Sequence, residues 1–192
     1  MKKKIILAIT GASGAIYALE FVSLMKELEI EVHGIISSAA EQVLKLETDL
    51  LRTDLLSVSR WFEVDDFAAP AASGSSLYDG MVVLPCSMGT LGGIANGLSR
   101  NLIHRAADVT LKERRPLVLA VRETPLNRVH LQNMLAAHEA GAIICPAMPA
   151  FYHKPESISD LARDFSSRIA QLLGCSVPGM LRWQGINALE EG

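Results

Sequence analysis

Short apolar runs alternate with longer amphipathic segments along this chain. The apolar runs have the length and composition of strands covered on both faces; they are Lys4–Ile9, Glu31–Ser37, Met81–Pro85, Leu117–Val121 and Ala142–Pro146. The amphipathic segments have helical spacing; they are Ala15–Leu28, Ser38–Glu47, Asn127–Glu139 and Ser157–Leu173. Because strands alternate with crossover helices, the pattern predicts an α/β fold with a doubly wound parallel sheet.

The composition limits the classes of protein to consider. A chain of 192 residues has the length of one domain with a full core, so we expect a single domain over residues 1–192. The formal net charge of -3 gives no indication of nucleic-acid binding, and no apolar run approaches the roughly 18 residues of a membrane span. Hydrophobic residues make up 49% of the chain, a surplus that favours large interfaces between subunits.

The cysteines and acidic residues do not indicate a metal site. Cys86, Cys145 and Cys175 are odd in number, far apart and without CxxC spacing, so neither a disulfide framework nor structural zinc is expected, and a reducing cytoplasm fits. The histidines have no metal-ligand spacing, and no further aspartates follow Asp65 and Asp66 as a magnesium-diphosphate site would require. We therefore expect no bound metal.

A glycine-rich turn follows the first apolar run. Gly11, Ala12, Ser13 and Gly14 lie between a predicted strand and a predicted helix, where small residues allow close approach and free N–H groups attract an anion. The spacing is that of neither the GxGxxG dinucleotide fingerprint nor the GxxxxGK[ST] loop. The turn favours a mononucleotide or a phosphorylated small molecule. The alternative is a tight turn in which Ser13 caps the helix.

Ligands of doubly wound folds bind beyond the carboxyl ends of the strands. Small, hydroxyl-bearing or charged residues follow four of the predicted strands; they are Gly11 to Ser13, Ser37 and Ser38, Ser87 to Thr90, and Arg122 with Glu123. This set is suited to a phosphate ester, although solvated loops would resemble it at any single strand end.

Basic residues add a second indication of an anionic ligand. Arg122 directly follows an apolar run, and Arg168 shares helical spacing with Leu161 and Phe165, so we expect it on an apolar face with an anionic partner. That partner is either a carboxylate or a ligand phosphate. For Arg114 and Arg115 we favour a solvated helix face. Residues 68–76, reading AAPAASGSS, are interpreted as an internal loop rather than a linker between domains.

Taken together, these segments resemble a known family, the flavin prenyltransferases of the UbiX type. The resemblance runs in order from residue 5 to about 183 and is carried by GASGAIY, ISSAAEQV with LETD, ASGS, PCSMGTL, NLIHRAADVTLKERRPLVLAVRETP, HLQNMLAAHEAGAIICPAMPAFYHKP and LRW. It implies a Rossmann-like (flavodoxin-like) sheet in three α/β/α layers and a homododecamer. It also implies transfer of a dimethylallyl group from dimethylallyl phosphate to N5 and C6 of reduced FMN, without a metal. The product, prenylated FMN, serves decarboxylases of the UbiD type.

The resemblance also implies a role for individual residues. The FMN site comprises Gly11, Ala12, Ser13, Ser37, Ser87, Met88, Gly89, Thr90 and Arg122. The dimethylallyl-phosphate site comprises Arg105, Lys112, Glu123, Tyr152 and Arg168, some of them from neighbouring subunits, with Trp183 nearby. Ser13 and Glu47 form a proton relay, Glu123 protonates the departing phosphate, and Lys112 stabilises its charge. Without the resemblance, the sequence would predict that Glu47 is a surface glutamate.

Two other functions remain open. A flavin-dependent decarboxylase of the phosphopantothenoylcysteine type shares the opening turn, but it carries a catalytic histidine and a PASANT-like segment where this chain reads PCSMGT. A non-catalytic flavin carrier is the second alternative. Five residues that the resemblance assigns to the reaction argue against lost catalysis: Glu47, Lys112, Glu123, Tyr152 and Arg168. A simple flavin binder would also leave its cations unpaired, which is costly.

Overall fold

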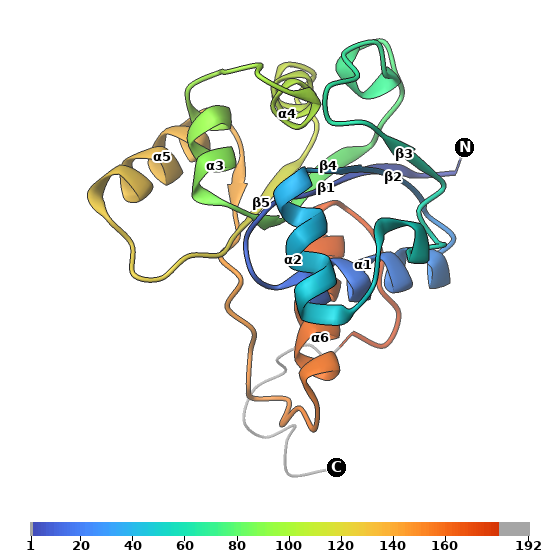
Figure 1. Ribbon diagram of the computed structural model, residues 1–192. Coiled ribbons are helices and arrows are strands. Elements are labelled where there is room, and N and C mark those ends of the chain that lie inside the picture. The colour runs from blue at the N-terminus through green and yellow to red at the C-terminus, as the bar shows by residue number, and fades with distance from the viewer. Residues whose placement is uncertain (1, 181–192) are drawn as a thin grey trace.

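The computed structural model describes residues 2–180 and contains one sheet of six parallel strands (Figure 1). The strands are β1 (Lys4–Ile9), β2 (Glu31–Ile36), β3 (Arg60–Phe62), β4 (Gly80–Cys86), β5 (Leu117–Val121) and β6 (Ile143–Ile144). The helices are α1 (Ala15–Glu27), α2 (Ser38–Thr48), α3 (Met88–Ala95), α4 (Leu102–Lys112), α5 (Arg128–Glu139) and α6 (Ile158–Leu172), with short 3-10 turns η1 (Arg52–Asp54) and η2 (Pro70–Ala72).

The strand order is β3-β2-β1-β4-β5-β6, which is the Rossmann order 3-2-1-4-5-6. When the three-residue β3 is left out, the remaining five strands have the flavodoxin order 2-1-3-4-5. The predicted doubly wound α/β fold is therefore confirmed. The chain changes direction across the sheet between β1 and β4, so their carboxyl ends form the crevice where such folds bind ligands.

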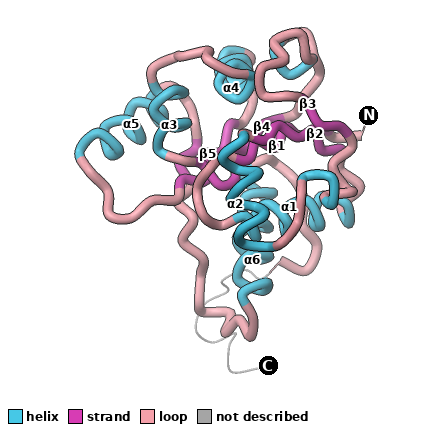
Figure 2. The backbone as a smooth tube through the Cα atoms, viewed as in Figure 1, coloured by secondary structure: helices cyan, strands magenta, loops and turns pink. Residues whose placement is uncertain are grey.

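Helices cover both faces of the sheet and give three layers (Figure 2). Ile5, Leu7 and Ile9 of β1 pack on the side of α1, α2 and α6. Ile6 and Ala8 of the same strand pack on the side of α3, α4 and α5. Side chains alternate between the faces of a strand, so a strand covered on both faces is apolar at every position, as the sequence pattern of β1 predicts.

Most predicted elements have the predicted bounds to within a residue or two. β1 and β5 are as predicted, and β6 is assigned only at Ile143 and Ile144. Its pairing with β5 nevertheless continues, because the N–H groups of Cys145 and Ala147 donate to β5 carbonyls. The prediction missed β3, which is short, α3, which contains three glycines, and α4.

The segment between β3 and β4 is an ordered loop of the same unit. Ala69 and Ala71 are buried under α4, and Asp79 pairs with the first residue of β1 through its backbone N–H and its carboxylate. The interpretation of residues 68–76 as an internal loop is confirmed. Within residues 2–180, no helix combines the length and the apolar character needed to cross a membrane.

Candidate active site

Thr10 ties together the two loops of the crevice. Its hydroxyl donates to the carbonyl oxygen of Pro85 at 2.8 Å and accepts from the N–H of Ser87 at 2.8 Å. Thr10 is 2% exposed, so both bonds are shielded from water. The loop after β1 and the loop after β4 are thereby held at a fixed separation. The sequence reading passed over Thr10 because it precedes the glycine turn.

The carboxylate of Glu47, at the end of α2, lies at the start of α1. Its Oε2 accepts from the N–H groups of Gly14 at 2.9 Å and Ala15 at 2.8 Å. Gly14 is the N-cap residue, with φ at 112°, and no side chain caps the helix from that position. The alternative of Ser13 as the helix cap is therefore wrong. We expected a bound anion at this helix start. The N–H groups of Gly14 and Ala15 instead bind a carboxylate of the chain itself.

Several groups hold Glu47 in its ionised form. Burial acts to raise the pKa of this carboxyl, but hydrogen bonds from the Ser13 hydroxyl and from the N–H groups of Ala15 and Gly14, together with the charge of Arg122, lower it below its ordinary value. Ser13 and Glu47 are the two residues predicted to form a proton relay, and the relay itself stays a prediction. A carboxylate that is ionised at neutral pH can accept a proton through the serine hydroxyl.

Two serines cap the helices that begin at the crevice. The Ser37 hydroxyl accepts from the N–H of Ala40 at the start of α2, and the Ser87 hydroxyl accepts from the N–H of Thr90 at the start of α3. A Cβ on Gly89 would meet no described heavy atom within 4 Å, so the first turn of α3 faces open space. A Cβ on Gly11 would lie 2.6 Å from the Cβ of Ala39, so glycine is needed there for close packing.

A cavity of about 290 Å³ adjoins these groups at the carboxyl ends of β5 and β6. Arg122 and Glu123 form its polar wall. The remaining lining is mostly apolar; it comprises Met88, Val121, Thr124, Leu126, Met134, Pro146, Ala147 and Met148. The sequence reading missed Met134, whose position on α5 gave no signal. The predicted residues Met88, Arg122 and Glu123 therefore line one cavity.

Arg168 does not lie on the apolar face predicted for it. The buried side of α6 is formed by Ala162, Phe165 and Ile169 among others, whereas Arg168 is exposed and donates to Oε1 of Gln171 at 3.0 Å. Burial raises the pKa of Cys145, which follows β6, and the positive charge of Arg168 acts in the opposite direction. The ring of Tyr152 lies against that of His153, with centroids 3.7 Å apart. Trp183 lies outside the described residues.

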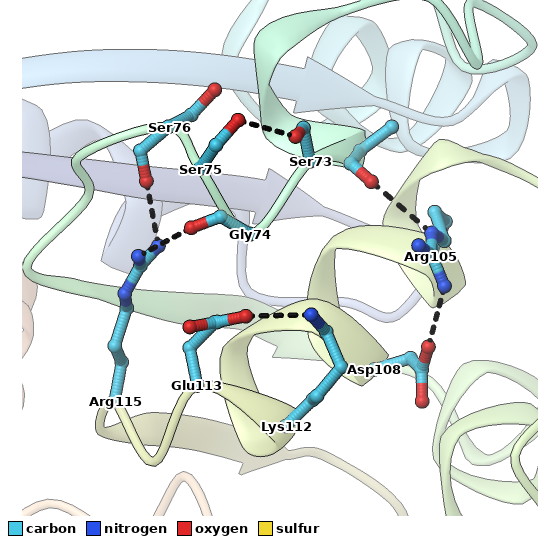
Figure 3. A network of polar contacts seen from close by, with 10 residues as sticks. Ser73, Gly74, Ser75, Ser76, Arg105, Asp108, Lys112, Glu113 and Arg115 are labelled. Atoms are coloured by element: carbon cyan, nitrogen blue, oxygen red, sulfur yellow. Dashed lines mark hydrogen bonds and ion pairs between the residues drawn. The ribbon is translucent and has the colours of Figure 1, made fainter.

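Arg105 lies near the start of α4, and Lys112 lies at the end of α4, away from the carboxyl end of β5. Lys112 ends α4 and precedes β5, whereas Arg122 follows it, so five residues of strand, about 17 Å, separate the two levels of the sheet. Arg105 bonds Asp108 at 2.8 Å and Lys112 bonds Glu113 at 2.6 Å (Figure 3). The structure does not bring Lys112 together with Arg122 and Glu123 in one subunit.

The fold and the crevice are those of a flavin-binding protein, and the sequence matches the Flavoprotein family over residues 1–167. The chain is 45% identical over 182 residues to the flavin prenyltransferase UbiX of Deinococcus radiodurans, and the match covers 94% of this chain and 93% of that protein. The chain belongs to the flavin prenyltransferase (UbiX) family.

Solved structures agree with this assignment. The structure of AnUbiX (PadA1) in complex with FMN and dimethylallyl pyrophosphate has a TM-score of 0.93 and 42% identity, over 96% of this chain and 99% of that one. A dodecameric FMN-dependent UbiX-like decarboxylase from Escherichia coli O157:H7 has a TM-score of 0.90 and 40% identity, over 95% and 100% of the two chains.

Proposed function

We propose that this protein transfers the dimethylallyl group of dimethylallyl phosphate to N5 and C6 of reduced FMN. The observation that carries this proposal is the carboxylate of Glu47, which accepts from the N–H groups of Gly14 and Ala15 after the loop that follows β1 and whose pKa Ser13 and Arg122 lower. This arrangement supplies a proton acceptor where a flavoprotein of this fold places its ligand. Membership of the UbiX family supports the same reaction.

The residues of the crevice fit FMN. The open first turn of α3, with Gly89 and Thr90 behind Ser87, offers N–H groups and hydroxyls to a phosphate. Ser37 and Arg122 add a hydroxyl and a guanidinium, and Gly11 and Ala12 keep the loop after β1 small. When bound and reduced, FMN supplies the nucleophilic atoms N5 and C6.

Ser13 and Glu47 are the groups that take up the proton released at N5. Glu47 is ionised before the reaction because Ser13, the start of α1 and Arg122 stabilise its negative charge. Its link to the site is the Ser13 hydroxyl, which can pass a proton to the carboxylate without moving the backbone. A neutral amide at position 47 would keep most of the geometry and lose this capacity.

Glu123 and the cations act on the phosphate of the second substrate. Phosphate is a poor leaving group, so a proton from Glu123 and positive charge from Arg168 favour its departure. Tyr152 and the apolar wall around Met134 keep water from the allyl group. We assign Arg105 and Lys112 to the site of a neighbouring subunit, because Lys112 precedes β5 and its own subunit therefore places it at another level of the sheet.

The assembly and the destination of the product belong to the same proposal. A homododecamer would bring α4 of one subunit to the crevice of another, and the dodecameric relative supports this arrangement. The prenylated FMN would then pass to a UbiD-type decarboxylase in the cytoplasm.

The deciding experiment is anaerobic incubation of the protein with reduced FMN and dimethylallyl phosphate in the presence of EDTA, followed by mass spectrometry of the released flavin. A flavin heavier by one prenyl unit is the expected result. Bound but unmodified FMN, with dimethylallyl diphosphate also unreactive, would overturn the proposal and favour a flavin-dependent decarboxylase or a carrier.

A further inference from the structure

The loop of residues 72–76 lies against the C-terminal end of α4 and is held there through its backbone. Arg115 donates to the carbonyl oxygens of Ser76 at 2.8 Å and Gly74 at 2.9 Å, and Arg105 donates to that of Ala72 at 3.2 Å (Figure 3). Arg115 is half-buried, so its interpretation as part of a solvated helix face is wrong. Two arginines thus bind three backbone carbonyl oxygens of this loop, at residues 72, 74 and 76.

Gly74 brings this backbone directly over an ion pair. A Cβ at position 74 would lie 2.1 Å from Oε1 of Glu113 and 2.8 Å from Nζ of Lys112. Both atoms are the far ends of flexible side chains, so a larger residue would displace the ion pair rather than disrupt the fold. Glycine is needed at this position because a side chain would occupy the space of the Lys112 and Glu113 side chains.

The ion pair depends on the way α4 ends. Adjacent residues inside a helix point in different directions, but Glu113 is the C-cap residue, and Arg114 after it adopts the left-handed conformation with φ at 55°. Lys112 can therefore bond Oε1 of Glu113 at 2.6 Å, and this bond lowers the pKa of the Glu113 carboxyl. The Lys112 side chain nevertheless remains 56% exposed and can reach outward.

We propose that Glu113 is a positioning residue for Lys112. It holds the lysine ammonium group beneath the 72–76 loop, in the conformation from which Lys112 contacts the substrate phosphate bound in a neighbouring subunit. This inference rests on the proposed function of Lys112. A lysine side chain loses much rotamer freedom when it is ordered, and a carboxylate that orders it in advance reduces that cost at the moment of binding.

The test compares Glu113→Gln, Lys112→Ala and the double variant in steady-state prenylation with saturating reduced FMN. Glu113→Gln should raise the KM for dimethylallyl phosphate about two- to five-fold, the size expected for an exposed ion pair, with kcat and the Kd for FMN unchanged. In the Lys112→Ala background, the same substitution should have no effect, because its target is absent.

A matched control is Glu27→Gln, which removes a glutamate paired with Arg163 on the opposite face of the sheet. It should leave the KM unchanged. Gly74→Ala keeps both charges but displaces them, so it should raise the KM in the same direction as Glu113→Gln while the melting temperature changes little.

The outcomes separate the two proposals. If Lys112→Ala has a normal KM, the assignment of Lys112 to the phosphate site is wrong, and the positioning role fails with it. If Lys112→Ala is impaired while Glu113→Gln is normal, or binds substrate more tightly, only the positioning role is wrong. An effect of Glu113→Gln that persists without Lys112 would show a structural role instead.

Discussion

Glu47 depends on the fold for its place in the site. In the sequence it is one glutamate near the end of an amphipathic helix, 33 residues from Gly14, whose N–H it accepts. The resemblance to UbiX proteins predicted its pairing with Ser13, and the structure adds a second role, because the same carboxylate caps α1. Propensity and periodicity could not have found this contact, since it joins the end of one helix to the start of another.

Glu47→Gln should lower the prenylation rate about 10²- to 10⁴-fold, the usual contribution of a positioned general base. Single-turnover formation of prenylated FMN, followed by mass spectrometry, measures this. Because the pKa of Glu47 is lowered below 4.5, its ionisation should not limit the wild-type rate until the pH falls below that value. The substitution should also cost about 0.5–1 kcal/mol of stability, since the start of α1 loses a negative charge.

Glu41→Gln is the matched control for this prediction. Glu41 lies on α2 as well, but it pairs with Arg52 at 3.3 Å and not with the start of α1. The rate should stay within about two-fold of wild type. Equal losses in the two variants would mean that charge on α2, rather than proton transfer through Ser13, governs the rate.

His33 is a buried titratable group on β2, beside Ile6 of β1. Its Nε2 lies 2.7 Å from Oε1 of Glu31, and a carboxylate only accepts, so Nε2 carries the proton. Nδ1 then accepts from the Tyr78 hydroxyl at 2.8 Å. Burial lowers the pKa of His33 below 6.5, and the charges of Lys4 and Arg60 add to this, although Glu31 opposes it.

This histidine makes stability depend on pH. Between the lowered folded pKa and the unfolded value near 6.5, the unfolded chain binds more protons than the folded one, so stability falls as the pH drops through that window. Urea unfolding between pH 7.5 and 5 should show this loss, and His33→Gln should reduce it. Because the pKa of His104 is lowered as well, part of the loss should remain. A His33→Gln profile parallel to wild type would contradict the assignment.

At the scale of elements, the sequence predicted long apolar strands and capped helices well, and it failed where packing overrides propensity. β3 has only three residues and is fixed by pairing with His33, Gly34 and Ile35 of β2. α3 contains three glycines and forms because Ser87 caps it and Leu91 and Ile94 are buried. Arg168 was misplaced because it lies beside, rather than on, the buried stripe of α6.

The two loops of the crevice should depend on Thr10. Thr10→Val keeps the shape but leaves the N–H of Ser87 and the Pro85 carbonyl without the hydroxyl, which should cost about 1–3 kcal/mol of unfolding free energy. FMN binding should weaken as well, because the start of α3 loses its anchor to β1. Denaturant unfolding and fluorescence titration with FMN measure the two effects.

Thr110→Val provides the comparison. Thr110 is also buried, but its hydroxyl donates to the Ala106 carbonyl within its own helix. Its loss should cost less and leave the Kd for FMN unchanged. If both valine variants bind FMN as tightly as wild type, Thr10 does not organise the crevice.

At the scale of the whole molecule, one subunit separates residues that we propose act together in the reaction. Ser13, Glu47, Arg122 and Glu123 lie at the carboxyl end of the sheet, whereas Lys112 lies at the start of β5. The sequence pattern predicts Ser13, Arg122 and Glu123 together, because strand ends share one edge, whereas only the family resemblance predicted Glu47. The pattern cannot predict the position of Lys112 in the site, because the periodicity of one chain carries no information on the arrangement of neighbouring subunits.

Shared sites should allow two inactive variants to complement each other. Lys112→Ala and Glu123→Gln, refolded or coexpressed together, should form mixed assemblies in which about a quarter of the sites combine both wild-type residues, if each site draws one from each of two subunits. Activity should recover to about that fraction. Mixed assemblies no more active than the separate variants would show that each site is built from a single subunit.

The contact between Glu47 and the start of α1 also joins the chemistry to the local stability of a helix. A proton taken up by this carboxylate removes the negative charge that the N–H groups of Gly14 and Ala15 contact at rest. Each turnover should therefore loosen the first turn of α1 for as long as the proton stays there. Hydrogen exchange at these two amides should then be faster during catalysis than in the resting protein. Its rate would report how often the proton is released to Glu47.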